Sequence, residues 1–180
     1  MIDATRISTL NDRPIRDGRY VLYWMQASQR VAYNHALEHA IARANELKLP
    51  VLVGFGLMDD YPEANERHYA FMLAGMADVH SGLEKRGIKF VVRHGAPQKI
   101  AIELSRHAAL LICDRGYLRH QRRWRDEVAD EAPCRVEQVE SDAVVPVEEV
   151  SSKAEFAAKL PFSFQLPRTK RLRKAINPTN

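Results

Sequence analysis

Five short apolar runs alternate with segments of helical periodicity along this 180-residue chain, and the alternation leaves few folds open. Continuous apolar runs are typical of parallel strands that are covered on both faces. With short connections between the segments, the pattern predicts an α/β fold, in which a five-stranded parallel sheet is doubly wound with helices on both faces. The expected strands are residues 20–25, 51–55, 88–92, 109–113 and 135–139, in the common sheet order 3-2-1-4-5.

The flanks of this pattern differ from its middle. Residues 1–19 are polar, contain Pro14 and Gly18, and are expected to form an irregular N-terminal arm. Residues 20–157 are expected to form the α/β domain, and residues 158–180 a basic tail or linker. The formal net charge is +4, but residues 168–174 alone hold five positive side chains. Because the rest of the chain is close to neutral, the charge is weak evidence for binding to nucleic acid.

The composition also excludes some classes of protein. No apolar run is long enough to cross a bilayer, and the N-terminus lacks the apolar stretch of a signal peptide. We therefore expect a cytoplasmic protein without membrane contact. The two cysteines, Cys113 and Cys134, form no Cys-x-x-Cys pair, and we expect reduced, buried thiols and no metal site.

The turn after the first expected strand contains aromatic, thioether and amide side chains that suit a flat organic molecule. Such a turn lies at the carboxyl edge of a parallel sheet, where open α/β sheets bind ligands. We expect Met25, Gln26, Gln29 and Arg30 to line a pocket there. A helix is expected to begin at Ser28, which would place the Arg30 cation unfavourably at a helix N-terminus and suggests an anionic partner. The alternative is that this turn contributes core and solvated residues only.

A second turn follows the fourth expected strand and emerges at the same edge of the sheet. Its Asp114, Arg115 and Tyr117 are expected to face the first turn across a crevice, because the first and fourth strands are neighbours in the expected order. Glu140, after the fifth strand, suits hydrogen bonds from a ligand ring or from Arg115, and a plain turn is the more common alternative.

A basic stripe continues from this turn along the next helix, which is expected over residues 118–129. Its candidate contacts with a nucleic acid are Arg119, Arg122 and Arg123. They suit contact with the phosphates of a nucleic acid, an interface to another domain, or a solvated helix face.

The sequence contains none of the loops that mark the common catalysts of this topology. It has no Gly-x-Ser-x-Gly elbow, no Walker loop and no Gly-x-Gly-x-x-Gly turn. No catalytic residue is therefore proposed from the sequence. The alternatives left open by these patterns are a small nucleic-acid-binding module and a small nucleotide-binding α/β domain.

Several long strings resemble class II cyclobutane pyrimidine dimer DNA photolyases. They are YVLYWMQASQR (20–30), YNHALE (33–38), GLMDDYPEANERHY (56–69), DRGYLR (114–119) and ESDAVVPV (140–147). The strings occur in the order of that family, and the resemblance extends over residues 6 to 157. It is confined to the family's N-terminal, Rossmann-like α/β domain.

The resemblance implies a light-harvesting role. In many photolyases this domain carries an antenna chromophore, which in class II enzymes can be an 8-hydroxy-deazaflavin. FAD and the DNA lesion bind to a larger C-terminal helical domain, in which excited reduced flavin splits the cyclobutane ring. We expect that domain to be absent from these 180 residues, so that the chain alone repairs no dimers and binds DNA weakly at most. Its expected partners are a flat aromatic chromophore and the helical FAD domain, and the chain could equally be a fragment, a truncated product or a natural stand-alone domain.

Overall fold

A computed structural model describes residues 2–147, and the expected basic tail at 158–180 lies outside this range. The chain divides into two compact units, Met1–Ser141 and Asp142–Asn180, and the first contains all the elements named below. They are a short 3-10 turn η1 (Ala4–Arg6), strands β1 (Ile7–Thr9), β2 (Tyr20–Trp24), β3 (Val51–Leu57), β4 (Lys89–His94), β5 (Ala108–Asp114) and β6 (Arg135–Val139), and helices α1 (His35–Leu47), α2 (Glu66–Glu84), α3 (Pro97–Ser105) and α4 (Arg119–Glu131).

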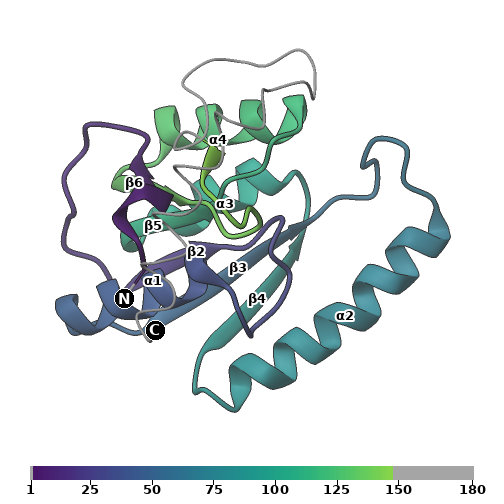
Figure 1. The fold of residues 1–180 in the computed structure, drawn as a ribbon, viewed down its shortest axis with the longest axis horizontal. Coiled ribbons are helices and arrows are strands. Elements are labelled where there is room, and N and C mark those ends of the chain that lie inside the picture. The colour runs from purple at the N-terminus through teal and green to yellow at the C-terminus, as the bar shows by residue number, and fades with distance from the viewer. Residues whose placement is uncertain (1, 148–180) are drawn as a thin grey trace, which may run out of the picture. The chain divides into compact units, whose positions relative to one another are not determined.

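The strands form one sheet in the order β1-β6-β5-β2-β3-β4 (Figure 1). Five of them are parallel and run β4-β3-β2-β5-β6, which is the predicted arrangement. The predicted number of strands is wrong by one, because part of the N-terminal arm forms β1. This strand pairs antiparallel with β6, with Ile7 opposite Val139 and Thr9 opposite Glu137. Three residues with a single large apolar side chain give too weak a pattern to stand out as a strand.

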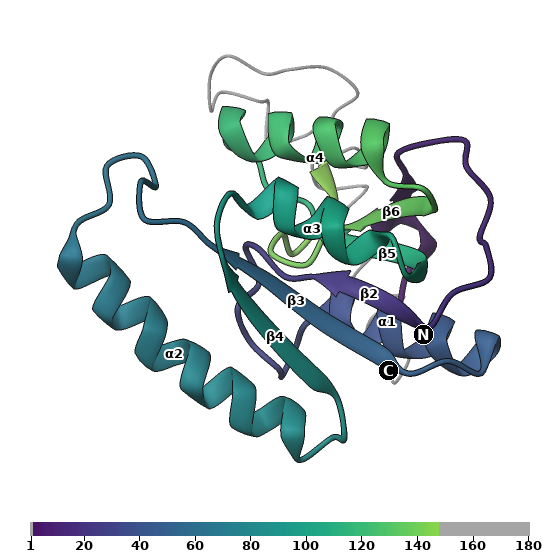
Figure 2. The same cartoon turned by 180° about the vertical axis from the view of Figure 1, so that it is seen from behind.

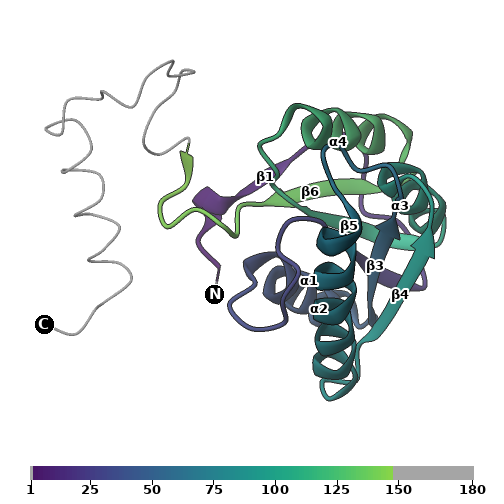
Figure 3. The same ribbon diagram turned by 90° about the vertical axis from the view of Figure 1, so that its right-hand side faces the viewer.

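Helices cover both faces of the sheet, as predicted. Helices α3 and α4 pack on one face, around a core that includes Leu22, Leu111 and Val128. Helix α1 and part of α2 pack on the other, around Leu37 and Leu110. Figures 2 and 3 show α4 and α1 on opposite sides of the sheet. This doubly wound arrangement leaves the carboxyl ends of β2 and β3 free of a covering helix, which is where ligands bind in such folds.

Helix α2 packs on the sheet through its C-terminal half only. Met76, Val79 and Leu83 are buried, whereas Phe71 is 84% exposed and Leu73 is 47% exposed. In Figure 2 the helix runs beside β4, at the edge of the sheet. The N-terminal half of α2 therefore leaves a space next to the end of β3.

A buried ion pair ties α1 to β6. The Nε2 atom of His39 lies 2.7 Å from the Glu137 carboxylate, and both side chains are largely buried. Burial acts to raise the pKa of Glu137, but the hydrogen bond and charge of His39, with Arg43 and Arg135, hold that pKa below its ordinary value. The pair therefore stabilises the packing of α1 on β6 in the ionised form of the carboxyl.

Both cysteines are buried, free thiols, as predicted. Burial raises the pKa of Cys113 to about 12 and that of Cys134 to about 11. Their thiolate forms are therefore scarce near neutral pH, and neither suits nucleophilic chemistry. Across residues 2–147, no helix is both long enough and apolar enough to span a lipid bilayer.

Candidate functional site

The turn after β2 is longer than the sequence predicted. Helix α1 begins at His35 and is capped by Asn34, whose side chain accepts a hydrogen bond from a backbone amide of the first turn. Ser28 is therefore not the cap, and Arg30 lies in the loop, where its Nε donates to the carbonyl of Tyr33 at 3.3 Å. The expectation of a cation at a helix N-terminus was wrong, because Asn34 is the cap and the helix begins only after it.

Asp114 holds this turn in place from the end of β5. The side chain is fully buried, with 0% exposure. Its carboxylate accepts hydrogen bonds from the Tyr23 hydroxyl at 2.8 Å and from the backbone amides of Gln26 and Ser28 at 2.8 and 3.1 Å. Asn34 completes the network by donating to the Tyr23 hydroxyl at 3.0 Å and to the Ser28 carbonyl at 2.9 Å. The structure thus places Asp114 beneath the turn, where it fixes the backbone of Gln26.

Arg115 and Tyr117 turn toward β6. Arg115 lies 3.2 Å from the carboxylate of Glu140, and the Tyr117 hydroxyl donates to the same carboxylate. Glu140 is only 1% exposed. Arg115 therefore pairs with Glu140, which is one of the outcomes expected from the sequence. The expected crevice between the two turns is wrong, because Asp114 is hydrogen-bonded directly to the backbone of the first turn.

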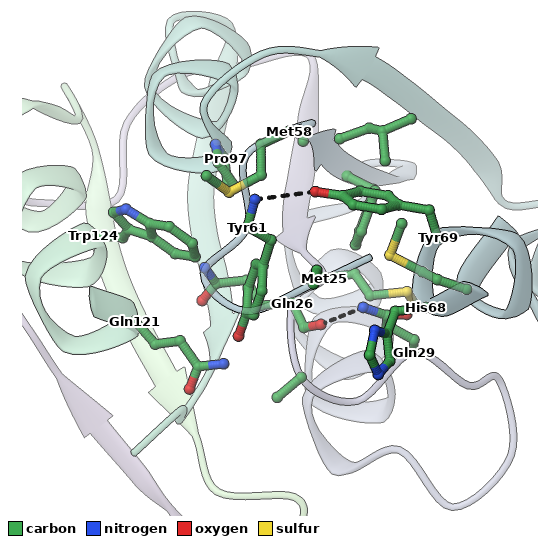
Figure 4. A pocket seen from close by; sticks show the side chains of 16 residues that line it. Met25, Gln26, Gln29, Met58, Tyr61, His68, Tyr69, Pro97, Gln121 and Trp124 are labelled. Carbon is green, nitrogen blue, oxygen red and sulfur yellow. Dashed lines mark hydrogen bonds between the residues drawn. The ribbon is translucent and has the colours of Figure 1, made fainter. Parts of the chain in front are cut away.

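A cavity of about 440 Å³ opens on the other side of the first turn, between the ends of β2 and β3, the N-terminal half of α2, and the starts of α3 and α4 (Figure 4). Three of the predicted residues line it: Met25, Gln26 and Gln29. Arg30, Asp114, Arg115 and Tyr117 do not belong to its lining. The structure thus brings Met25, Gln26 and Gln29 to the cavity, whereas Asp114 supports their turn from beneath and Arg115 and Tyr117 lie with Glu140.

The rest of the lining was missed by reasoning from the sequence. Thioether and aromatic side chains predominate in it: Met58, Tyr61, Tyr69, Met72 and Trp124, with Phe55 from β3 and His68 from α2. Among the described residues that line the cavity, none is Asp, Glu, Lys or Arg. The signal was present in the string 56–69, which carries two tyrosines and a methionine beyond the second strand.

The loop between β3 and α2 is fixed over the cavity by Tyr61. Its backbone amide donates to the Tyr69 hydroxyl at 3.0 Å, and its own hydroxyl lies 3.0 Å from Nε2 of His120. The rings of Tyr61 and His120 meet edge to face, with centroids 5.1 Å apart, and His120 stacks similarly on Trp124. These contacts join the loop to α4 and give the cavity a rigid aromatic wall.

His68 contributes a defined donor to the same wall. Its Nδ1 accepts a hydrogen bond from the backbone amide of Asn65, the residue that caps α2. A neutral ring that accepts at Nδ1 carries its proton on Nε2. The cavity therefore combines apolar surface with a few neutral polar groups, which is the usual composition of a small-molecule site.

Comparison with known proteins identifies the family. Residues 21–174 match the family model described as DNA photolyase. The chain belongs to the DNA photolyase family. The resemblance found in the sequence is thereby confirmed at the level of this family.

Curated relatives agree with this assignment. A deoxyribodipyrimidine photo-lyase of Methanothermobacter thermautotrophicus is 49% identical over 159 residues, which are 88% of this chain and 36% of the relative. One of Arabidopsis thaliana is 36% identical over 143 residues, covering 77% of this chain and 29% of the relative. The chain thus spans about a third of the length of these relatives, and it matches their N-terminal part.

Solved structures of low sequence identity share the fold alone. A functionally unknown protein of Pseudomonas aeruginosa superposes with a TM-score of 0.52 at 14% identity, covering 76% of this chain and 52% of that protein. The universal stress protein UspA of Lactobacillus plantarum gives a TM-score of 0.50 at 14% identity, covering 69% of this chain and 99% of UspA. They support the doubly wound α/β class of this photolyase-family chain.

The basic stripe on α4 divides into exposed and buried members. Arg119, Arg122 and Arg123 are exposed, and Arg123 pairs with Glu127 at 3.1 Å. Arg125 is buried instead and donates to a carbonyl of its own helix. Three arginines of this photolyase-family helix therefore face solvent, and their contact with DNA phosphates stays a prediction.

Proposed function

We propose that this chain is the light-harvesting N-terminal domain of a class II deoxyribodipyrimidine photolyase, and that the cavity beside β2 and β3 holds its flat aromatic chromophore. The observation that carries the proposal is a cavity walled by thioether and aromatic side chains, without charged groups among its described lining residues, in a member of the DNA photolyase family. Family membership does not favour a stand-alone nucleic-acid-binding or nucleotide-binding module.

The residues of the cavity fit such a chromophore. Its volume of about 440 Å³ lies within the range of small-molecule pockets. Methionine sulfur and aromatic ring edges interact favourably with a flat π system, and tyrosine and tryptophan offer broad apolar contact. Met25, Met58 and Tyr69 would contact the ring system, with Gln26 and Gln29 beside its polar edge. When bound, the chromophore would absorb light and supply excitation energy, and an 8-hydroxy-deazaflavin is the form that we propose.

The second turn has a supporting role in this proposal. Asp114 would position the first turn through its hydrogen bonds to the backbone of Gln26 and Ser28. Arg115 and Tyr117 would stay with Glu140, while Arg30 would remain hydrogen-bonded to the Tyr33 carbonyl within the loop. Of the contacts predicted from the sequence, the proposal keeps Met25, Gln26 and Gln29, and it adds the cavity wall formed by residues between 58 and 72.

The remaining partners follow from the family. We propose that FAD and the pyrimidine dimer bind to a helical domain of the whole enzyme, and that this chain contributes the light-collecting part of a cytoplasmic DNA-repair lyase. Exposed arginines on α4 support no more than weak contact of this chain with DNA.

Titration with 8-hydroxy-5-deazaflavin tests the proposal, with quenching of ligand fluorescence as the measurement. We expect saturable binding with a dissociation constant of about 10 μM or below, equivalent to about −7 kcal/mol. Met72→Asp places a charge in the cavity wall and should abolish binding, because a carboxylate there would be desolvated against an apolar ring. Leu73→Asp is the matched control, since Leu73 is the next residue on α2 and does not line the cavity. Absence of binding to the unmodified chain, or equal loss in both variants, would remove the site.

A further inference from the structure

One residue of the cavity carries polar atoms that the protein leaves unused. In residues 2–147, five buried side-chain nitrogen or oxygen atoms have no hydrogen-bond partner, and two of the five are Nε2 and Oε1 of Gln26. The others belong to Trp24, Arg43 and Gln98. Buried polar groups are nearly always paired in folded proteins, so an amide with both ends unpaired needs an explanation.

The backbone of Gln26, in contrast, is held from both sides. Its amide donates to Asp114 at 2.8 Å, and its carbonyl accepts from Nε2 of Gln29 at 2.9 Å. The main chain of Gln26 is therefore fixed at the cavity, while its carboxamide has no hydrogen-bond partner among the described residues. The hydrogen bond to the Gln26 carbonyl occupies Nε2 of Gln29. Gln26 is therefore the better candidate in the first turn for a hydrogen bond to a bound molecule.

The chemistry of a carboxamide defines its complement. In one plane it presents an acceptor oxygen beside a donor nitrogen, and the matching group is an N–H next to a C=O in a ring. Cyclic amides and imides present this edge, whereas ethers, hydrocarbons and carboxylates do not. Because the described lining holds no charged side chain, a charged edge would be desolvated there without compensation.

We infer that Gln26 is a specificity-determining residue, whose carboxamide pairs with the cyclic amide or imide edge of a neutral, flat aromatic guest. The inference rests on the proposed function of the cavity. Two hydrogen bonds form on binding: Nε2–H of Gln26 donates to the ring carbonyl, and Oε1 accepts from the ring N–H. The carboxamide atoms have no contact with solvent, so the side chain turns about its own torsions to meet the guest.

Two probes that differ in a single group test this pairing. One is a 5-deaza-isoalloxazine with a free N–H at its imide edge, and the other is the same ring methylated at that nitrogen. Fluorescence titration of the unmodified chain should give about tenfold tighter binding of the N–H probe, since one lost hydrogen bond with its partner left unpaired corresponds to about that factor.

Variants separate hydrogen bonding from shape. Gln26→Leu keeps much of the side-chain volume and should bind both probes equally, because it can neither donate nor accept. Gln26→Glu loses the donor and should bind the N–H probe less tightly than the unmodified chain does. Gln98→Leu is the matched control, since Gln98 also has a buried side-chain oxygen without a partner among the described residues but does not line the cavity, and it should keep the tenfold preference. Thermal unfolding followed by circular dichroism verifies that each variant is folded.

The outcomes distinguish this inference from the proposed function. If the unmodified chain binds neither probe, the chromophore site itself is overturned. If it binds both probes equally, or if Gln26→Leu retains the preference, the role of Gln26 is overturned while the site stands. A preference that disappears in Gln26→Leu and persists in Gln98→Leu supports the pairing, because a steric effect of the methyl group would act in both variants.

Discussion

Replacing Asp114 by asparagine should loosen the turn that forms one wall of the cavity. The carboxylate accepts from the Tyr23 hydroxyl and from two backbone amides, those of Gln26 and Ser28. An asparagine side chain has one acceptor oxygen, and its NH₂ group must face one of these donors. At least one buried donor then loses its acceptor, and the remaining bonds lose the assistance of the negative charge.

The size of the effect follows from these contacts. A buried donor left unpaired costs about 1–3 kcal/mol, and the loss of charge assistance adds to this. We expect Asp114→Asn to lower the free energy of unfolding by about 2–4 kcal/mol. For a chain of this length, about 2–4 °C of melting temperature corresponds to each kcal/mol, so the melting temperature should fall by about 5–15 °C.

Urea denaturation followed by circular dichroism measures this change, with Asp78→Asn as the control. Asp78 is exposed on α2, and the same substitution there should change stability by no more than about 0.5 kcal/mol. Binding of the deazaflavin should also weaken in Asp114→Asn, because the backbone of Gln26 is no longer fixed. Equal stability of the two variants would refute the conclusion that the carboxylate holds the turn.

Two further predictions concern the frame around the cavity. Glu137→Gln should lower stability by about 1–2 kcal/mol near pH 7, because the ionised carboxyl pairs with His39. Urea denaturation should show this difference fading as the pH falls below about 4.5, through the lowered pKa of Glu137. A difference that persists once the carboxyl is protonated would contradict the pairing. Gly56→Ala should lower the free energy of unfolding by about 2 kcal/mol or more, since an added Cβ would lie 2.5 Å from the Cα of Pro97 on α3. Its control is Gly75→Ala within α2, where an added Cβ meets open space and should raise stability by about 0.5–1 kcal/mol. Thermal unfolding measures both changes.

The parallel sheet could be predicted because its strands carry their own signal. Each is a continuous apolar run, and alternation with helical segments then restricts the topology to a doubly wound sheet. Strand β1 gives no such signal, since its three residues are stabilised by pairing with β6 rather than by apolar pattern. The start of α1 was misplaced for a similar reason. Ser28 and Asn34 are both good caps in sequence, and only the tertiary contacts of Asp114 draw Ser28 into the loop.

The site was predicted in part, because topology fixes an edge of the sheet but not the path of the loops along it. Met25, Gln26 and Gln29 lie at the cavity since they follow a central strand. The second turn does not reach it, because a single buried carboxylate, that of Glu140, attracts both Arg115 and the Tyr117 hydroxyl. Glu140 could be predicted at the end of this strand, but the sequence left open whether it pairs with Arg115 or with a ligand.

The apolar stripe of α2 shows most clearly why the cavity escaped prediction. Helical spacing from Tyr69 to Leu83 suggests one continuous buried face, yet only the half from Met76 onward is buried. The spacing of apolar residues in a sequence shows that one face of a helix is apolar, but it does not show what covers that face. Here the N-terminal half of the face turns its tyrosine and methionine toward a cavity instead of the sheet, and the loop carrying Tyr61 is fixed beside them by hydrogen bonds. Two features of this cavity lower the stability of the protein independently. Within the described part of the chain, one is an apolar helix face that no side chain covers, and the other is the buried, unpaired carboxamide of Gln26. A ligand that covers the face and pairs with the carboxamide would remove both destabilising effects.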